Sequence, residues 1–213
     1  TWMSGPMRGL LDRHFGEGWS ELVDEPGFWD TVLTLDDGEL WQLHCELKDA
    51  LLAHAREEAR RRWAERWKEA AHVVGAGTLL NSNALTIGFA RRFATYKRAS
   101  LLFRDFDRLR ELLVNPWRPV QIIFAGKAHP EDQGGKEVLQ EVYTYTRDPR
   151  LQGRVAFIED YDMHLAHRLV EGVDLWMNVP RVPLEASGTS GMKAGLNAVP
   201  QLNRQGQVQQ IVS

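Results

Sequence analysis

The sequence is poor in several features that commonly reveal function. It has 213 residues but only one cysteine, Cys45, so an internal disulfide is excluded and a reducing, cytoplasmic setting is expected. No run of about eighteen apolar residues occurs and the first residues carry no charged or apolar leader, so we expect neither a membrane span nor a signal. Metal-binding spacings such as His-x-x-x-His and Cys-x-x-Cys are missing, so no metal is expected. The net charge of -3 excludes a general attraction to nucleic acid or anionic membranes.

The composition, with 43% hydrophobic and 26% charged residues, is that of a globular chain. Residues 1–78 are interpreted as a helical segment. A helix is expected to start within residues 36–39, and Cys45 within it is expected to be a buried thiol. Leucines at spacings of three and four predict the buried face of this helix: Leu40, Leu43, Leu47, Leu51 and Leu52. Because the first residue is not methionine, we expect the chain to begin inside a larger protein.

The later part of the helical segment combines charges of both signs with two tryptophans. Trp63 and Trp67 lie one turn apart among arginines, an arrangement that would suit nucleic acid. Four glutamates interleave with the arginines, which favours a solvated helix face with the tryptophans docked on a core: Glu57, Glu58, Glu65 and Glu69. Nucleic acid is therefore not expected as a partner.

Beyond residue 78 the periodicity changes to short apolar runs separated by helical patterns. Strands are predicted at residues 85–89, 120–126, 155–158 and 173–179, and helices at residues 98–113, 135–146 and 164–171. This alternation is typical of βαβ units, and it predicts the α/β class with a Rossmann-like parallel sheet over residues 79–202. Ligands of such sheets bind beyond the carboxyl ends of the strands. Residues 203–213 are interpreted as a divergent, truncated tail.

The stretch from Glu185 to Lys193 (EASGTSGMK) is the main candidate site. Small residues before a helix that starts near Gly188 would turn backbone N–H groups toward an anion. Lys193 follows Thr189 by four residues, so both lie on one helix face, where the lysine would pair with the anion or react with an aldehyde. The alternative is an ordinary turn rich in glycine and serine with a surface lysine.

Three further segments follow predicted strands. Residues 90–98 contain four cations and no acid, a composition suited to phosphate, although Arg98 and Arg91 could also simply face solvent. His129, in a turn before proline, is interpreted as a structural, hydrogen-bonded group. Three carboxylates adjoin in sequence without the distant partners that a glycosidase pair or a metal site needs: Glu159, Asp160 and Asp162.

Together these motifs resemble those of the α-glucan phosphorylases (glycogen, starch and maltodextrin phosphorylases), most closely the short bacterial type. The matching elements are EASGTSGMK at residues 185–193, RRFATYKR at 91–98, GKAHP at 126–130, EDY at 159–161 and TWM at 1–3. Their order and separations also agree over nearly the whole chain. The departures are Ala125 in place of a glycine, Gly195 and Ala198 in the last motif, and the tail after Leu202.

The resemblance implies specific roles. Lys193 would hold pyridoxal 5'-phosphate as a Schiff base, and Arg92 and Lys97 would bind the substrate phosphate. The other implied cofactor contacts are Thr189, Ser190, Tyr161 and Arg91, and the implied sugar contacts are Glu185, Ser187 and Gly188. The implied reaction is phosphorolysis of an α-1,4-glucan by inorganic phosphate to glucose 1-phosphate.

The resemblance also implies the C-terminal half of a GT-B fold, whose active site lies between two Rossmann-like halves. The N-terminal half would be missing, so we expect the isolated chain to be inactive. We also expect the sheet to end near Val199, without later elements to cover its last strand. Two alternatives stay open: a glycosyltransferase of the same architecture that uses a nucleotide sugar, and a glucan-binding fragment without catalysis.

Overall fold

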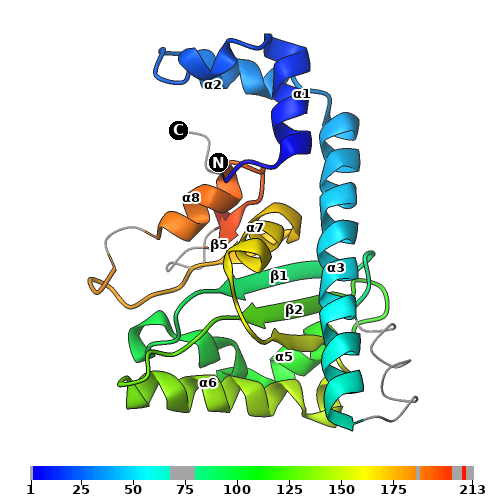
Figure 1. The fold of residues 1–213 in the computed structure, drawn as a ribbon, viewed down its shortest axis with the longest axis vertical. Helices are drawn as coiled ribbons and strands as arrows, with labels where there is room; N and C mark the ends of the chain where they lie inside the picture. Colours follow the sequence, from blue (N-terminus) through cyan, green and yellow to red (C-terminus); the bar gives the residue numbers. More distant parts are fainter. Residues whose placement is uncertain (1, 68–79, 186–187, 203–207, 210–213) are drawn as a thin grey trace.

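The computed structural model describes residues 2–67, 80–185, 188–202 and 208–209, and it consists of a parallel sheet between helices with a helical arm beside it (Figure 1). The helices are α1 (Gly5–Phe15), α2 (Phe28–Thr31), α3 (Asp37–Trp67), α5 (Phe106–Leu113), α6 (Gln133–Thr146), α7 (Met163–Gly172) and α8 (Thr189–Gly195). Short 3-10 turns are η1 (Trp19–Glu21), η2 (Val32–Thr34), η3 (Thr95–Lys97), η4 (Ala99–Asp105) and η5 (Pro149–Leu151). The strands are β1 (Leu85–Ala90), β2 (Val120–Ala125), β3 (Val155–Ile158), β4 (Leu175–Met177), β5 (Gln201–Leu202) and β6 (Val208–Gln209).

The sheet has the order β3-β2-β1-β4-β5-β6, in which the first five strands run parallel and β6 runs antiparallel to β5. The apolar runs form these strands because a parallel sheet is covered on both faces and therefore favours apolar side chains. The carboxyl ends of the first three strands are aligned, since Ala90 pairs with Ala125 and Ala125 pairs with Ile158. The predicted α/β class with a Rossmann-like parallel sheet is confirmed.

Two hydrophobic cores form on opposite faces of the sheet because successive strand residues point to opposite sides. On β2, Ile123 and Ala125 pack with α3 and α7, whereas Ile122 and Phe124 pack with η4, α5 and α6. Figure 1 shows α5 and α6 on one side of the strands and α3 and α7 on the other. The carboxyl end of the sheet, where the candidate site lies, is thus held by helices packed on both faces.

The long helix α3 is held to the sheet by its leucine face and by a buried ion pair. Three of the predicted leucines are at most 6% exposed: Leu47, Leu51 and Leu52. Next to them, the Lys48 ammonium donates to Asp174 Oδ2 at 2.6 Å, and the His44 ring nitrogen lies 2.7 Å from Asp174 Oδ1. The backbone N–H of Thr86 donates to the same carboxylate at 2.6 Å. This cluster, Lys48–His44–Asp174–Thr86, fastens α3 to the amino ends of β1 and β4.

Burial alone would raise the pKa of the Asp174 carboxyl. Hydrogen bonds from His44, Lys48 and the Thr86 N–H, together with the charge of Lys48, outweigh burial and hold this pKa below its ordinary value. The carboxylate is therefore the form that the folded chain favours.

Several expectations about local structure were wrong in detail. The helix predicted from residue 98 begins later, because Arg98 takes a left-handed backbone (φ 53°) and residues 99–105 form a 3-10 turn before α5. The strand predicted at residues 173–179 is only Leu175–Met177, since Val173 packs into the core against Gly88. The sheet continues past Val199, where β5 pairs with β4.

Two expectations concern single side chains of the helical segment. Cys45 is half-buried instead of buried. Trp63 and Trp67 lie in the last turns of α3, where the structure does not describe side chains, so their docking stays a prediction. Among the described residues, no helix is both long and apolar enough to cross a bilayer.

Candidate functional site

The candidate site lies at the carboxyl ends of β1, β3 and β4. Arg91 directly follows β1, Asn178 directly follows β4, and Tyr161 follows β3 by three residues. A tight turn after β2 completes this edge: Gly126 has a left-handed backbone (φ 145°), and a Cβ on it would lie 2.1 Å from the Arg91 carbonyl oxygen. Only glycine allows the two chain segments to approach so closely. The same edge was predicted as the ligand-binding side of the sheet.

A buried ion cluster joins three of the predicted site residues. The Arg91 guanidinium donates through Nη2 to Glu185 Oε1, and the Lys97 ammonium donates to Glu185 Oε2 at 3.1 Å. The side chains of Arg91, Glu185 and Lys97 are only 8%, 12% and 12% exposed. The pair of cations therefore shares one carboxylate, and the cluster Arg91–Glu185–Lys97 carries one positive charge in excess.

Asn178 and Tyr161 complete the surroundings of Arg91. Arg91 Nη1 donates to Asn178 Oδ1, while Arg91 Nε is buried without a hydrogen-bond partner among the described residues. Burial raises the pKa of the Tyr161 hydroxyl and the charge of Arg91 opposes this rise, so the phenol stays protonated near the guanidinium. Asn178 also links the ion cluster to α8, because a Cβ on Gly188 would lie 2.1 Å from Asn178 Nδ2. Gly188 is thus needed where α8 begins against β4.

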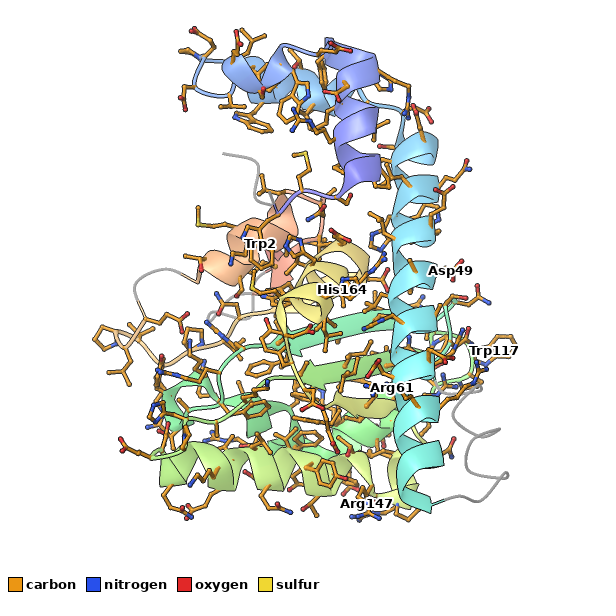
Figure 2. All side chains as sticks on the ribbon, in the orientation of Figure 1. Trp2, Asp49, Arg61, Trp117, Arg147 and His164 are labelled. Carbon is orange, nitrogen blue, oxygen red and sulfur yellow. The ribbon has the colours of Figure 1, made fainter. Side chains whose placement is uncertain are left out.

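Lys193 lies on α8 in a second, aromatic cluster. Its ammonium lies 3.6 Å from the centroid of the Trp2 ring, and Trp2 in turn stacks on His167 with centroids 4.2 Å apart. Asn197 holds the N-terminal segment that carries Trp2. Its amide donates to the Trp2 carbonyl at 2.9 Å, and its Oδ1 accepts from the Ser4 N–H at 2.8 Å. Figure 2 shows Trp2 beside α8. Lys193 is half-buried and forms no ion pair with any described residue.

The remaining predicted residues lie apart from these clusters. Arg92 is exposed and has no hydrogen-bond or ionic partner among the described residues. Thr189 is exposed at the first position of α8, and Ser190 accepts a hydrogen bond from the buried Trp176 indole at 3.2 Å. Ser187 lies outside the described residues. The structure therefore brings together Arg91, Lys97 and Glu185, and places Arg92 and Lys193 separately.

Arg98 belongs to the frame of the site. Its guanidinium donates from Nε to the Val179 carbonyl at 2.6 Å and from Nη2 to the Pro180 carbonyl at 3.4 Å. It is half-buried, so the simple solvent-facing alternative considered for Arg98 was wrong. The contact ties the cationic segment to the segment that leads to Glu185.

The carboxylates after β3 have local roles or contacts. Asp162 caps α7 by accepting from the Leu165 N–H at 2.8 Å. Glu159 and Asp160 each have interactions within the chain. His129 is exposed and its Nδ1 accepts from the Glu131 N–H at 3.2 Å, as expected for a structural turn histidine. Within the described residues, no group of three or more His, Cys, Asp or Glu side chains could hold a metal ion.

Sequence reasoning missed three residues that surround the candidate site: Trp2, Asn178 and Asn197. Asn178 carried a usable signal, since it is a polar residue at the end of an apolar strand run. Trp2 and Asn197 are almost two hundred residues apart and no local pattern joins them. Their contact depends on the tertiary fold, which brings the N-terminal segment with Trp2 against the end of α8.

The chain is similar in sequence to known proteins over most of its length. Residues 30–203 match the family model of the carbohydrate phosphorylases. The chain is 45% identical over 203 residues to a glycogen phosphorylase of Aquifex aeolicus, with 95% of the chain and 29% of that protein aligned. It is equally similar to a maltodextrin phosphorylase of Thermococcus litoralis, at 45% identity over 95% of the chain and 24% of that protein. A glycogen phosphorylase of Mycobacterium tuberculosis is 43% identical over 84% of the chain and 21% of its own length. The chain thus spans less than a third of the length of these relatives.

Proposed function

The chain belongs to the carbohydrate phosphorylase family, and from this premise we propose that it is the phosphate- and cofactor-binding part of an α-glucan phosphorylase. The reaction would be phosphorolysis of an α-1,4-glucan by inorganic phosphate, with glucose 1-phosphate as product. The observation that carries the proposal is the convergence of Arg91, Lys97 and Glu185 at the carboxyl edge of the sheet. The names of the relatives favour this reaction over transfer from a nucleotide sugar or simple glucan binding.

Inorganic phosphate would be held by Arg92 and Lys97. Arg92 is the second residue after β1 and is exposed, with its guanidinium available for a bidentate contact to phosphate oxygens. Lys97 lies at the end of η3 with its ammonium largely shielded from water, which strengthens its attraction for an anion. The two cations would also offset the negative charge that inorganic phosphate gains when it gives its proton to the glycosidic oxygen.

The sugar would be bound by Glu185, the backbone at Gly188 and Ser187. The Glu185 carboxylate offers two acceptor oxygens for sugar hydroxyls, and both now accept from cations of the site. Gly188 precedes the first residue of α8, so its neighbours present N–H groups at the start of a helix. These contacts would place the glycosidic bond beside the phosphate.

The residues around α8 fit pyridoxal 5'-phosphate. Lys193 supplies a half-buried primary amine without an ionic partner among the described residues, which is the donor that covalent attachment of an aldehyde requires. Thr189 and Ser190 are the first two residues of α8. Tyr161 and Arg91 lie at the carboxyl ends of the strands, where the candidate site is. When bound, the cofactor supplies a phosphate group that exchanges a proton with inorganic phosphate near neutral pH.

We assign residues 79–202 to a Rossmann-like catalytic domain of the GT-B type, residues 1–78 to a helical segment that leads into it, and residues 203–213 to a divergent tail. The second wall of the cleft would come from a preceding half of the enzyme, in line with the share of the relatives that the chain spans. The 213-residue chain alone should therefore be inactive, because it would neither orient the sugar fully nor exclude water. We place the whole enzyme in the cytoplasm.

Labelling of Lys193 tests the proposal directly. The purified chain is incubated with pyridoxal phosphate, reduced with borohydride and mapped by peptide mass spectrometry. The expected label is on Lys193, and replacement of Lys193 by methionine should abolish it. Labelling of Lys127 or Lys136 with Lys193 unmodified would refute the assignment.

A further inference from the structure

The Glu185 carboxylate uses both of its oxygens on the cations of the anion site. Oε1 accepts from Arg91 and Oε2 accepts from Lys97 at 3.1 Å, with all three side chains nearly buried. Charge-assisted hydrogen bonds of this kind are among the stronger polar contacts in proteins, and partial burial reduces their screening by water and salt. An anion that approaches Lys97 therefore meets a donor that is already engaged.

The cluster nevertheless offers more positive charge and more donors than one carboxylate can satisfy. Two cations face one anion, and the buried Nε of Arg91 has no hydrogen-bond partner among the described residues. Phosphate carries more negative charge than a carboxylate and has more acceptor oxygens. A phosphate ion can therefore displace the carboxylate, but only by giving up part of its own binding free energy.

We propose that Glu185, held in place by Arg91, is a built-in competitor of phosphate at Lys97, and that phosphate binding releases its carboxylate to accept hydroxyl groups of the sugar. This inference rests on the proposed function, since it assumes that phosphate binds at Lys97. The same carboxylate would then serve both ligands in turn, so phosphate should increase the affinity for sugar, and sugar should increase the affinity for phosphate by the same factor.

The test is direct binding of inorganic phosphate to the 213-residue chain by isothermal titration calorimetry at pH 7. Glu185→Gln keeps the size of the side chain and removes its charge, and it should raise the phosphate affinity about tenfold, because no anion then holds Lys97. Glu141→Gln on α6 removes the same charge at an exposed site and should leave the affinity unchanged. Adding Lys97→Met to Glu185→Gln should abolish the gain.

Each outcome decides the inference. Equal or weaker phosphate binding by Glu185→Gln, with measurable binding by the unmodified chain, would overturn the competitor role and leave the proposed phosphate site intact. Absence of phosphate binding in both proteins would overturn the proposed site together with the inference. If the higher phosphate affinity of Glu185→Gln persists when Lys97→Met is added, the gain does not arise at Lys97. This outcome also overturns the inference. If circular dichroism shows that Glu185→Gln does not fold, Glu185→Asp carries the same test, with a smaller gain expected from its shorter reach to Lys97.

Discussion

Replacement of Asp174 by asparagine should destabilise the chain strongly, because Asp174 is the anion that balances the buried Lys48. Their side chains are 8% and 6% exposed, and the carboxylate also accepts from His44 and from the Thr86 N–H. An asparagine keeps one acceptor oxygen but loses the charge, so the Lys48 ammonium stays buried without a counterion. Removal of one partner of a buried ion pair costs about 3–5 kcal/mol.

This loss is large beside the total free energy of unfolding of a domain, about 5–15 kcal/mol. With a denaturant slope of about 2 kcal/mol/M in urea, the midpoint should fall by about 1.5–2.5 M. Asp49→Asn is the matched control: it changes the residue after Lys48 on the same helix, but Asp49 is exposed and points away from the sheet (Figure 2). The control should change stability by less than about 0.5 kcal/mol.

The effect should also depend on pH. The pKa of Asp174 is lower in the folded chain than its ordinary value, so its contribution is fully present above the unfolded pKa of about 3.9 and is lost as the pH falls through the folded pKa. The difference between Asp174→Asn and the unmodified chain should therefore be large at pH 7 and shrink below about pH 4. Urea unfolding followed by circular dichroism at both pH values measures it. A midpoint shift below about 0.5 M at pH 7 would contradict the claim that the pair holds α3 to the sheet.

Two further predictions concern the proposed activity. Arg92→Lys should weaken phosphate binding by about 1.5–3 kcal/mol, because the planar fork of the guanidinium is lost, whereas Arg110→Lys, a change at an exposed residue of α5, should have no effect; unchanged affinity in both variants would make Arg92 an ordinary surface arginine. The 213-residue chain should produce no glucose 1-phosphate from maltoheptaose and phosphate, with or without pyridoxal phosphate; turnover of about 1 per second or more would show that this part of the enzyme suffices.

The sheet could be predicted from the sequence because its strands are short apolar runs with a local signal. β1, β2 and β3 start at the predicted residues 85, 120 and 155, and α6 and α7 end within one residue of their predicted ends. The run at 173–179 forms only the short strand β4, and the two residues before this strand make tertiary contacts: Val173 packs on Gly88, and Asp174 pairs with Lys48. Apolar periodicity does not separate a strand residue from a buried loop residue.

The helix predicted to start at Arg98 starts later, at Phe106, for a related reason. Its left-handed backbone accompanies hydrogen bonds from its guanidinium to the carbonyls of Val179 and Pro180, about eighty residues away in sequence. The local pattern of residues 98–113 is helical, and these distant contacts override it. Such an override is common where a chain segment lines a site.

The candidate site shows the same division between local and distant information. Motifs placed Arg91, Lys97 and Glu185 at the ends of predicted strands, and parallel strands necessarily bring those ends to one edge. No motif indicates which cation faces which anion, because the choice depends on side-chain reach across that edge. Arg91, which the resemblance assigns to the cofactor, is buried on Glu185, while Arg92, assigned to phosphate, is the exposed one. The buried arginine thus fixes the carboxylate, and the exposed arginine stays available to a ligand. Replacing Arg91 should therefore disturb the position of Glu185 and should not remove a direct contact with phosphate.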